Sequence, residues 1–233
     1  MDSNELMQKA IDKGRLHDIA IIGGLTPEAI NHIDSYSGFT PLSYAVSTVR
    51  DEATQLAIVN QLIELGANVN YRGGRLNSTI LMAAVQRSPA SVVEKLIKAG
   101  ADINAVNKHG HTALKLAIDE NKIDNIRVLI NNGAMIEPVD VYNASLGRHD
   151  DIAKVLLNHR PELIVSTVDY AISRGRIDIA DKIKSLMPEA AWNRRGAMVI
   201  GYKRAVNMMG GRRRTRRHRG RSRARRNRRT HKA

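Results

Sequence analysis

One phrase, Leu-Ile-x-x-Gly-Ala, occurs three times in this chain of 233 residues and constrains the fold more than any other feature. The copies cover residues 62–67, 96–101 and 129–134, so their glycines are 34 and then 33 residues apart. A second phrase, which begins with Thr, precedes each copy. Two independent phrases at near-constant spacing indicate an internal repeat, because unrelated helical hairpins would not keep that spacing by chance.

The residues of one unit predict a pair of helices. Thr40, Thr79 and Thr112 suit the N-cap, where a threonine hydroxyl accepts a hydrogen bond from a free backbone N–H. Leu and Ala then recur at helical spacing, and the Gly of the other phrase suits the left-handed conformation that ends a second helix. One such pair cannot bury its apolar faces alone, so neighbouring units are expected to stack.

One unit is longer than the next two. From Thr to the Gly of Gly-Ala the distance is 26 residues in the first of the three units and 21 in the others. We therefore expect five extra residues between its two phrases, around residues 47–54.

The period, with Gly-x-Thr-Pro-Leu at 38–42 and Gly-Ala-x-Val-Asn at 66–70, resembles the ankyrin repeat family. The resemblance is strong over residues 38–136. A marker similar to the family's Gly-His-x-x-Ile phrase, at the start of the second helix, extends it at Gly14, Gly147 and Gly175. The resemblance implies an all-α fold, a helical solenoid of about six helix-pair repeats with short turn hairpins. The expected units are 1–34, 35–70, 71–104, 105–137, 138–163 and 164–189, and the last two are short enough to have lost part of the hairpin.

Resemblance to this family also implies protein recognition on the concave surface formed by turn tips and first-helix faces. By position, the turn tips include Tyr36 and Phe39. The first-helix position that faces the groove is occupied by Tyr44, Ala83 and Leu116 in the different units. Tyr and Arg are favoured interface anchors. The predicted protein-binding residues are Tyr44, Tyr71, Arg72, Arg75, Lys108 and His109. The alternative, that they are ordinary solvated loop residues, stays open for each.

No constellation of catalytic residues is found in the sequence. It has no Cys, no phosphate-binding Gly-x-x-x-x-Gly-Lys loop, no Gly-x-Ser-x-Gly elbow and no His-Glu-x-x-His phrase. His109 and His111 are either half of a metal site or, as we favour, solvated histidines of a turn. Asp150 and Asp151 form an acid–base pair or, as we favour, acids at a helix start, where the helix dipole is positive. We expect no enzyme and no cofactor.

The positive charge is concentrated at the C-terminus. The formal net charge is +14, of which residues 212–233 contribute +13 through 12 Arg and 1 Lys. This segment lacks acids and large apolar side chains, so it cannot offset its ordering entropy and is predicted to be disordered. Arginine grips phosphate in a bidentate fashion, which favours salt-dependent nucleic-acid contact with little sequence preference.

Other functions of this basic end stay open. Lys203-Arg204, followed by Arg212-Arg213-Arg214, resembles a two-part nuclear import signal. An acidic lipid surface, an acidic protein or simple solubilisation are further alternatives. Residues 190–211, which include Trp192, are predicted to be a capping segment and linker. The nucleic-acid or nuclear-targeting candidates are Lys203, Arg204, Arg212, Arg213, Arg214, Arg216, Arg217, Arg219, Arg221, Arg223, Arg225, Arg226, Arg228 and Arg229.

The expected protein is an intracellular monomer, in the nucleus, the cytoplasm or both. Residues 1–24 show no secretory signal, and no stretch approaches the roughly 18 apolar residues of a membrane span. Arginine-rich tails after Gly-Gly also look like those of many proteins of large DNA viruses, which leaves a viral source and a host-cell location open. The favoured function is an adaptor that binds an unidentified protein, with a tail for nucleic-acid contact or nuclear targeting. The alternative is a tail-driven nucleic-acid binding or packaging protein whose repeats are only a scaffold.

Overall fold

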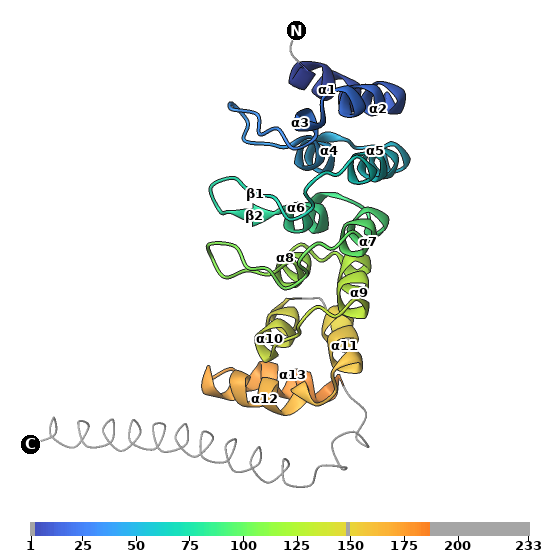
Figure 1. The fold of residues 1–233 in the computed structure, drawn as a ribbon. Helices are drawn as coiled ribbons and strands as arrows, with labels where there is room; N and C mark the ends of the chain where they lie inside the picture. Colours follow the sequence, from blue (N-terminus) through green and yellow to red (C-terminus); the bar gives the residue numbers. More distant parts are fainter. Residues whose placement is uncertain (1–2, 148–149, 187–233) are drawn as a thin grey trace, which may run out of the picture. The chain divides into compact units, whose positions relative to one another are not determined.

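The computed structural model describes residues 3–147 and 150–186 of the chain (Figure 1). It divides into two compact units, Met1–Ala144 and Ser145–Ala233, and the boundary falls inside helix α10. The predicted capping segment 190–211 with Trp192, and the predicted disordered tail 212–233, lie outside the described residues.

Helices dominate the described residues, which confirms the predicted all-α class. In the first unit the helices are α1 (Ser3–Asp12), α2 (Leu16–Leu25), α3 (Pro27–Ile30), α4 (Pro41–Thr48), α5 (Glu52–Glu64), α6 (Ile80–Arg87), α7 (Ala90–Lys98), α8 (Ala113–Asp119) and α9 (Ile123–Asn131). The remaining helices are α10 (Pro138–Leu146), α11 (Asp150–His159), α12 (Leu163–Ser173) and α13 (Ile177–Ser185). The strands β1 (Arg72–Gly73) and β2 (Ser78–Thr79) form one small antiparallel hairpin.

Consecutive helices of the first unit pack in pairs and the pairs stack. Helices α4, α6 and α8 form one layer, and α5, α7 and α9 form a second layer beside it (Figure 1). The apolar phrases supply the core between the layers: Leu42, Leu81 and Leu114 are at most 1% exposed, and Leu62, Leu96 and Leu129 are fully buried. Complete burial of a leucine side chain stabilises a fold by about 1.5–3 kcal/mol, so the repeated Leu positions hold the stack together.

Each predicted threonine cap is confirmed. The hydroxyl of Thr40 accepts a hydrogen bond from the backbone N–H of Ser43 at 3.3 Å. Thr79 and Thr112 accept in the same way from Met82 and Lys115, at 3.2 and 3.1 Å. Such a bond satisfies one of the free N–H groups at a helix start and contributes about 1 kcal/mol.

The chain turns through the left-handed region at equivalent points of successive units. Gly66, Gly100 and Gly133 have φ of 89–90°, as the predicted helix ends require. Two asparagines take the same region where related units have glycine. Asn77 (φ 53°) lies two residues before its Thr cap, like Gly38 and Gly110, and Asn121 (φ 55°) begins the second-helix marker. Asparagine tolerates this conformation better than most residues.

Most of the five extra residues of the longer unit form helix rather than loop. Helix α5 has 13 residues, against nine in α7 and nine in α9. Asp51 caps the added turn by accepting from the backbone N–H of Thr54 at 2.8 Å. Buried Gln55 lies on the lengthened helix and donates to the carbonyls of Ala45, Val46 and Val49 at 3.0–3.2 Å, which ties α5 to the end of α4.

The second unit contains helix pairs without long hairpins. Helices α12 and α13 pack on each other, around Ala171 and Ile183. From α13, Lys182 donates to the carbonyls of Ser145 and Gly147 at 3.0 Å and forms an ion pair with Asp150 at 2.6 Å. Asp150 therefore begins α11 as the partner of a lysine, in keeping with a helix-start role.

Candidate protein-binding surface

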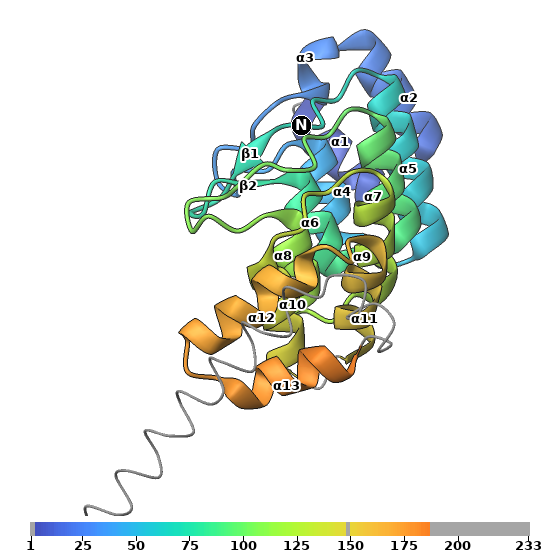
Figure 2. The same ribbon diagram turned by 90° about the horizontal axis from the view of Figure 1, so that it is seen from below.

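Three hairpins project from the first unit on the side of α4, α6 and α8, away from α5, α7 and α9 (Figure 1 and Figure 2). They lie between the end of one helix pair and the Thr cap of the next, over residues 31–40, 68–79 and 101–112. In the middle one, β1 and β2 pair with Arg72 opposite Thr79 and Gly73 opposite Ser78. The connection from α9 to α10 is much shorter, running only from Asn131 to Pro138.

Three asparagines connect successive loops, and we call Asn31, Asn70 and Asn104 the asparagine ladder. Asn70 donates to the carbonyl of Gly100 at 2.9 Å and accepts from the N–H of Asp102 at 2.8 Å. Asn31 forms the same two bonds with Gly66 and Asn68, at 3.0 and 2.7 Å. Asn104 accepts from the N–H of Met135 at 2.8 Å. Each of these asparagines is one rung of the ladder and satisfies the hydrogen-bonding capacity of backbone groups that helix packing leaves free.

The hairpins also contact one another nearer their tips. The hydroxyl of Tyr71 donates to the carbonyl of Gly38 at 2.7 Å. The guanidinium of Arg72 donates to the carbonyl of Val106, and the backbone N–H of Lys108 donates to the carbonyl of Leu76 at 2.9 Å. The three hairpins therefore form one continuous surface.

Aromatic side chains gather at the first two hairpins. Tyr36 is fully exposed and Phe39 is 36% exposed. The ring of Phe39 meets the ring of Tyr44 edge to face, with centroids 6.4 Å apart. The hydroxyl of Tyr44 donates to Asp12 of α1 at 2.8 Å, and burial together with this carboxylate raises the pKa of Tyr44. Tyr44 is thus half-buried and held in place.

Basic side chains follow on the second and third hairpins. Arg75, Lys108 and His109 are exposed, as is Arg72. The rings of His109 and His111 lie 5.8 Å apart, and the side chain of Asn107 accepts from the backbone N–H of both residues at 2.9 and 3.0 Å. These bonds shape the turn. Within the described part of the chain, no group of three or more potential ligands for a metal ion occurs.

A model of a known family matches part of this chain. Its description is ankyrin repeats (3 copies), and it matches residues 52–140, the part that carries helices α5 to α9 and two of the three hairpins.

Residues 52–140 contain ankyrin repeats.

Known proteins are similar to this chain over about half of its length. The neurogenic locus notch homolog protein 1 of Xenopus laevis is 34% identical over 110 residues, which are 47% of this chain and 4% of that protein. A putative ankyrin repeat protein of fowlpox virus is 30% identical over 120 residues (52% and 18%), and another, of Acanthamoeba polyphaga mimivirus, is 33% identical over 118 residues (51% and 14%). This chain spans less than a fifth of the length of each of these relatives.

The structure brings the six predicted protein-binding residues to the ankyrin hairpins and the adjoining helix α4. Tyr71 and Arg72 form hydrogen bonds between hairpins, and Tyr44 forms one with α1. Among the described residues, the side chain of Arg75 has no hydrogen-bond or ion-pair partner. Ala83 and Leu116 are half-buried on α6 and α8. The predicted nucleic-acid and nuclear-targeting residues, Lys203, Arg204 and the arginines from Arg212 to Arg229, lie outside the described residues.

Sequence reasoning missed the polar groups that connect the loops. The asparagine ladder had a visible signal, the polar residues that recur after Gly-Ala at 68–70 and 102–104. It also missed Asp140, in the first turn of α10, which accepts from the N–H of Glu137 at 2.9 Å. Burial raises the pKa of Asp140 to about 6, because the charged form loses solvation there. No helix in the described ranges is long and apolar enough to cross a membrane.

Proposed function

We propose that the three ankyrin hairpins and the adjoining face of α4 bind a protein partner, and that this chain is a non-enzymatic adaptor. The observation that carries the proposal is the single continuous hairpin surface, on which aromatic and basic side chains are presented. Ankyrin repeats generally mediate protein–protein interaction, and a stack of repeats offers an extended surface for it.

The residue types on this surface support a protein partner. The chain has only six Tyr, one Phe and one Trp, and Tyr36, Phe39, Tyr44 and Tyr71 are four of these. Aromatic and arginine side chains dominate the energy of protein interfaces, and they do so best where neighbouring groups hold them rigid. The bonds of Tyr44 to Asp12 and of Tyr71 to Gly38 provide that rigidity.

The second part of the proposal concerns the C-terminal segment 212–233, which gives the adaptor its nucleic-acid contact or its nuclear targeting. Its support is the charge of +13 over 22 residues. Arginine side chains neutralise phosphates and release counterions, so binding of this kind is non-specific and falls steeply with salt. Putative ankyrin repeat proteins of two viruses are among the relatives, so a viral source and a host-cell location remain part of the proposal.

A second candidate function is a nucleic-acid packaging protein, in which the same segment does the work and the repeats are a scaffold. The concentration of nearly all net charge in one short segment favours it. The two candidates differ in what each part of the chain retains, so one experiment separates them.

The test captures partners on the full chain and on two full-length variants, with nuclease and at two salt concentrations. In the first variant Arg72→Glu and Arg75→Glu alter the hairpins, and in the second the twelve arginines of 212–233 become Gln. A nuclease-resistant protein that loses about tenfold or more in affinity with the hairpin variant supports the adaptor. Arg127→Glu, at an exposed arginine of α9, is the matched control and should change little.

A different outcome would favour the second candidate function. Partners that disappear with nuclease, with salt or with the neutralised tail, and that bind the hairpin variant normally, favour the packaging protein and contradict the adaptor.

A further inference from the structure

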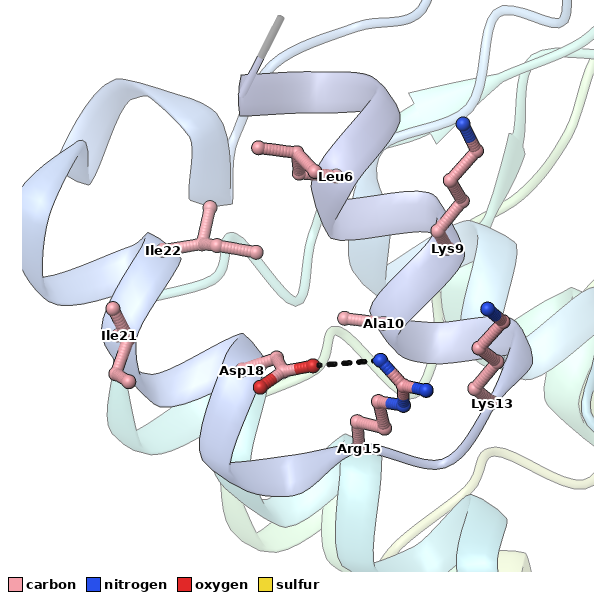
Figure 3. A pocket seen from close by; sticks show the side chains of 8 residues that line it. All are labelled: Leu6, Lys9, Ala10, Lys13, Arg15, Asp18, Ile21 and Ile22. Carbon is pink, nitrogen blue, oxygen red and sulfur yellow. Dashed lines mark hydrogen bonds and ion pairs between the residues drawn. The ribbon is translucent and has the colours of Figure 1, made fainter. Parts of the chain in front are cut away.

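The first helix pair carries a pocket on its outer side. The inner side of α1 and α2 packs on α4 and α5 through Met7, Ile11 and Ile19, which are at most 1% exposed. On the outer side, Leu6 and Ile21 are 43% and 45% exposed. Between the two helices there lies a pocket with a volume of about 340 Å³, lined by Leu6, Lys9, Ala10, Lys13, Arg15, Asp18, Ile21 and Ile22 (Figure 3).

The lining of this end pocket is divided by chemistry. Leu6, Ile21 and Ile22 lie on one side of it, and Lys9, Lys13 and Arg15 lie on the other (Figure 3). The one acid among the lining residues, Asp18, is 3.5 Å from Arg15, and the two side chains are 42% and 59% exposed, so solvent weakens this ion pair. The end pocket is therefore an apolar groove with a basic rim.

We propose that the end pocket binds an acidic amphipathic helix of a partner protein. The apolar side takes the hydrophobic residues that such a helix places at i, i+3, i+4 and i+7, and the basic rim pairs with glutamates or aspartates that flank them. Exposed apolar residues that cluster in a hollow, with charge of one sign along the edge, are the arrangement that helix-in-groove recognition uses.

Other occupants fit this chemistry less well. The chain's own segment 212–233 is strongly basic and has no apolar side chain larger than Ala, so it would repel the rim and leave the groove empty. A second copy joined through the same face would bring two basic rims together at the interface, where like charges oppose association. An acidic, apolar helix satisfies both halves of the pocket.

The test uses a synthetic 16-residue peptide with leucines at i, i+3, i+4 and i+7 and glutamates on both flanks. The reference is a scrambled peptide of the same composition. Both peptides attract the arginine-rich segment equally, so the readout is specific to the pocket: methyl NMR shifts of Leu6, Ile21 and Ile22 in the full chain. We expect saturable shifts with the patterned peptide and none with the scrambled one.

Variants assign the binding to the two halves of the pocket. Ile21→Gln and Lys13→Glu should each weaken the patterned peptide at least about fivefold. Ile33→Gln, at an isoleucine that is 51% exposed in the first hairpin, and Lys122→Glu, at the position equivalent to Arg15, are the matched controls and should not. Ile33 belongs to the hairpin surface, whereas Ile21 lines the end pocket. The two variants therefore test the proposal for the pocket separately from the proposed adaptor surface.

Several results would overturn the proposal. These are unshifted methyls at 1 mM peptide, equal binding of the scrambled peptide, and equal binding of a peptide with lysines for the glutamates. Self-association of the chain that Ile21→Gln abolishes would assign the pocket to a second copy and overturn it as well.

Discussion

The central repeats and the helix pairs of the second unit use the same helices but join them differently. From α4 to α9, a long hairpin precedes each pair, a threonine caps the first helix of each pair, and the asparagine ladder connects one loop to the next. In the second unit α12 follows α11 after three residues, and its N-cap residue, Glu162, forms no side-chain cap. Helix packing alone builds a pair, whereas the hairpins add the connections between pairs and the surface that we propose as the binding site for a partner.

The largest expected effect compares matched cavities in the two regions. Leu96→Ala in α7 and Leu156→Ala in α11 each remove a fully buried leucine and should cost about 2–5 kcal/mol of the free energy of unfolding. Because the ladder and the hairpins connect the central pairs, Leu96→Ala should lower hydrogen-exchange protection throughout α4 to α9. Leu156→Ala should lower it within α11 to α13. Protection lost only in α7 after the Leu96→Ala change would show that the loop connections do not make the central pairs cooperative.

The next effect tests the point where the hairpins stop. Helix α10 begins without a threonine cap and uses buried Asp140, whose raised pKa of about 6 means that the folded protein holds a proton that the unfolded chain releases near pH 4. The free energy of unfolding should therefore fall as pH rises from about 4 to about 6. Asp140→Asn should remove this slope and stabilise the protein at pH 7 by up to about 3 kcal/mol, measured by urea unfolding.

The same pH window separates Asp140 from other carboxylates. Hydrogen bonds from Arg176 lower the pKa of Asp178 to about 2, and hydrogen bonds from Ser37 and Thr54 lower the pKa of Asp34 and Asp51. Their contributions are present above pH 4 and are lost only as pH falls further. An unchanged slope between pH 4 and 6 in Asp140→Asn would assign it to another group.

The smallest effect concerns a single rung. Asn70→Ala removes two hydrogen bonds to backbone groups of the next loop and should cost about 1 kcal/mol, since each exposed bond of this kind contributes modestly. Asn131→Ala, at an exposed asparagine that forms no rung, should stay within about 0.5 kcal/mol of the wild type. Thermal unfolding of the two variants measures the difference, and equal midpoints would mean that the ladder orders the loops without stabilising them.

What the sequence could predict was local or periodic. Thr40, Thr79 and Thr112 cap a helix through a residue three positions away, so a short window reveals them. The left-handed glycines and the place of the five extra residues follow from spacing alone. The added turn of α5 was not foreseen, because spacing locates an insertion without fixing its conformation.

What it missed depends on groups distant along the chain. Asn70 meets Gly100 and Asp102, 30 and 32 residues away, and Tyr44 meets Asp12 across 32 residues. The repeated polar residues mark the position of Asn70, but no local pattern identifies the partner in either contact. The raised pKa of Asp140 likewise arises from burial that only the packed helices create. The apolar phrases predict that helices stack, but not which polar groups then face each other.

Because of the asparagine ladder, successive repeats are joined through equivalent backbone positions. Every rung presents one acceptor and, at Asn31 and Asn70, one donor to the same two backbone positions of the unit that follows. We therefore expect that after deletion or duplication of a whole unit the flanking units can still form these contacts at the new junction. Because the same two contacts recur between successive units, the number of units can change without requiring a new kind of contact between them.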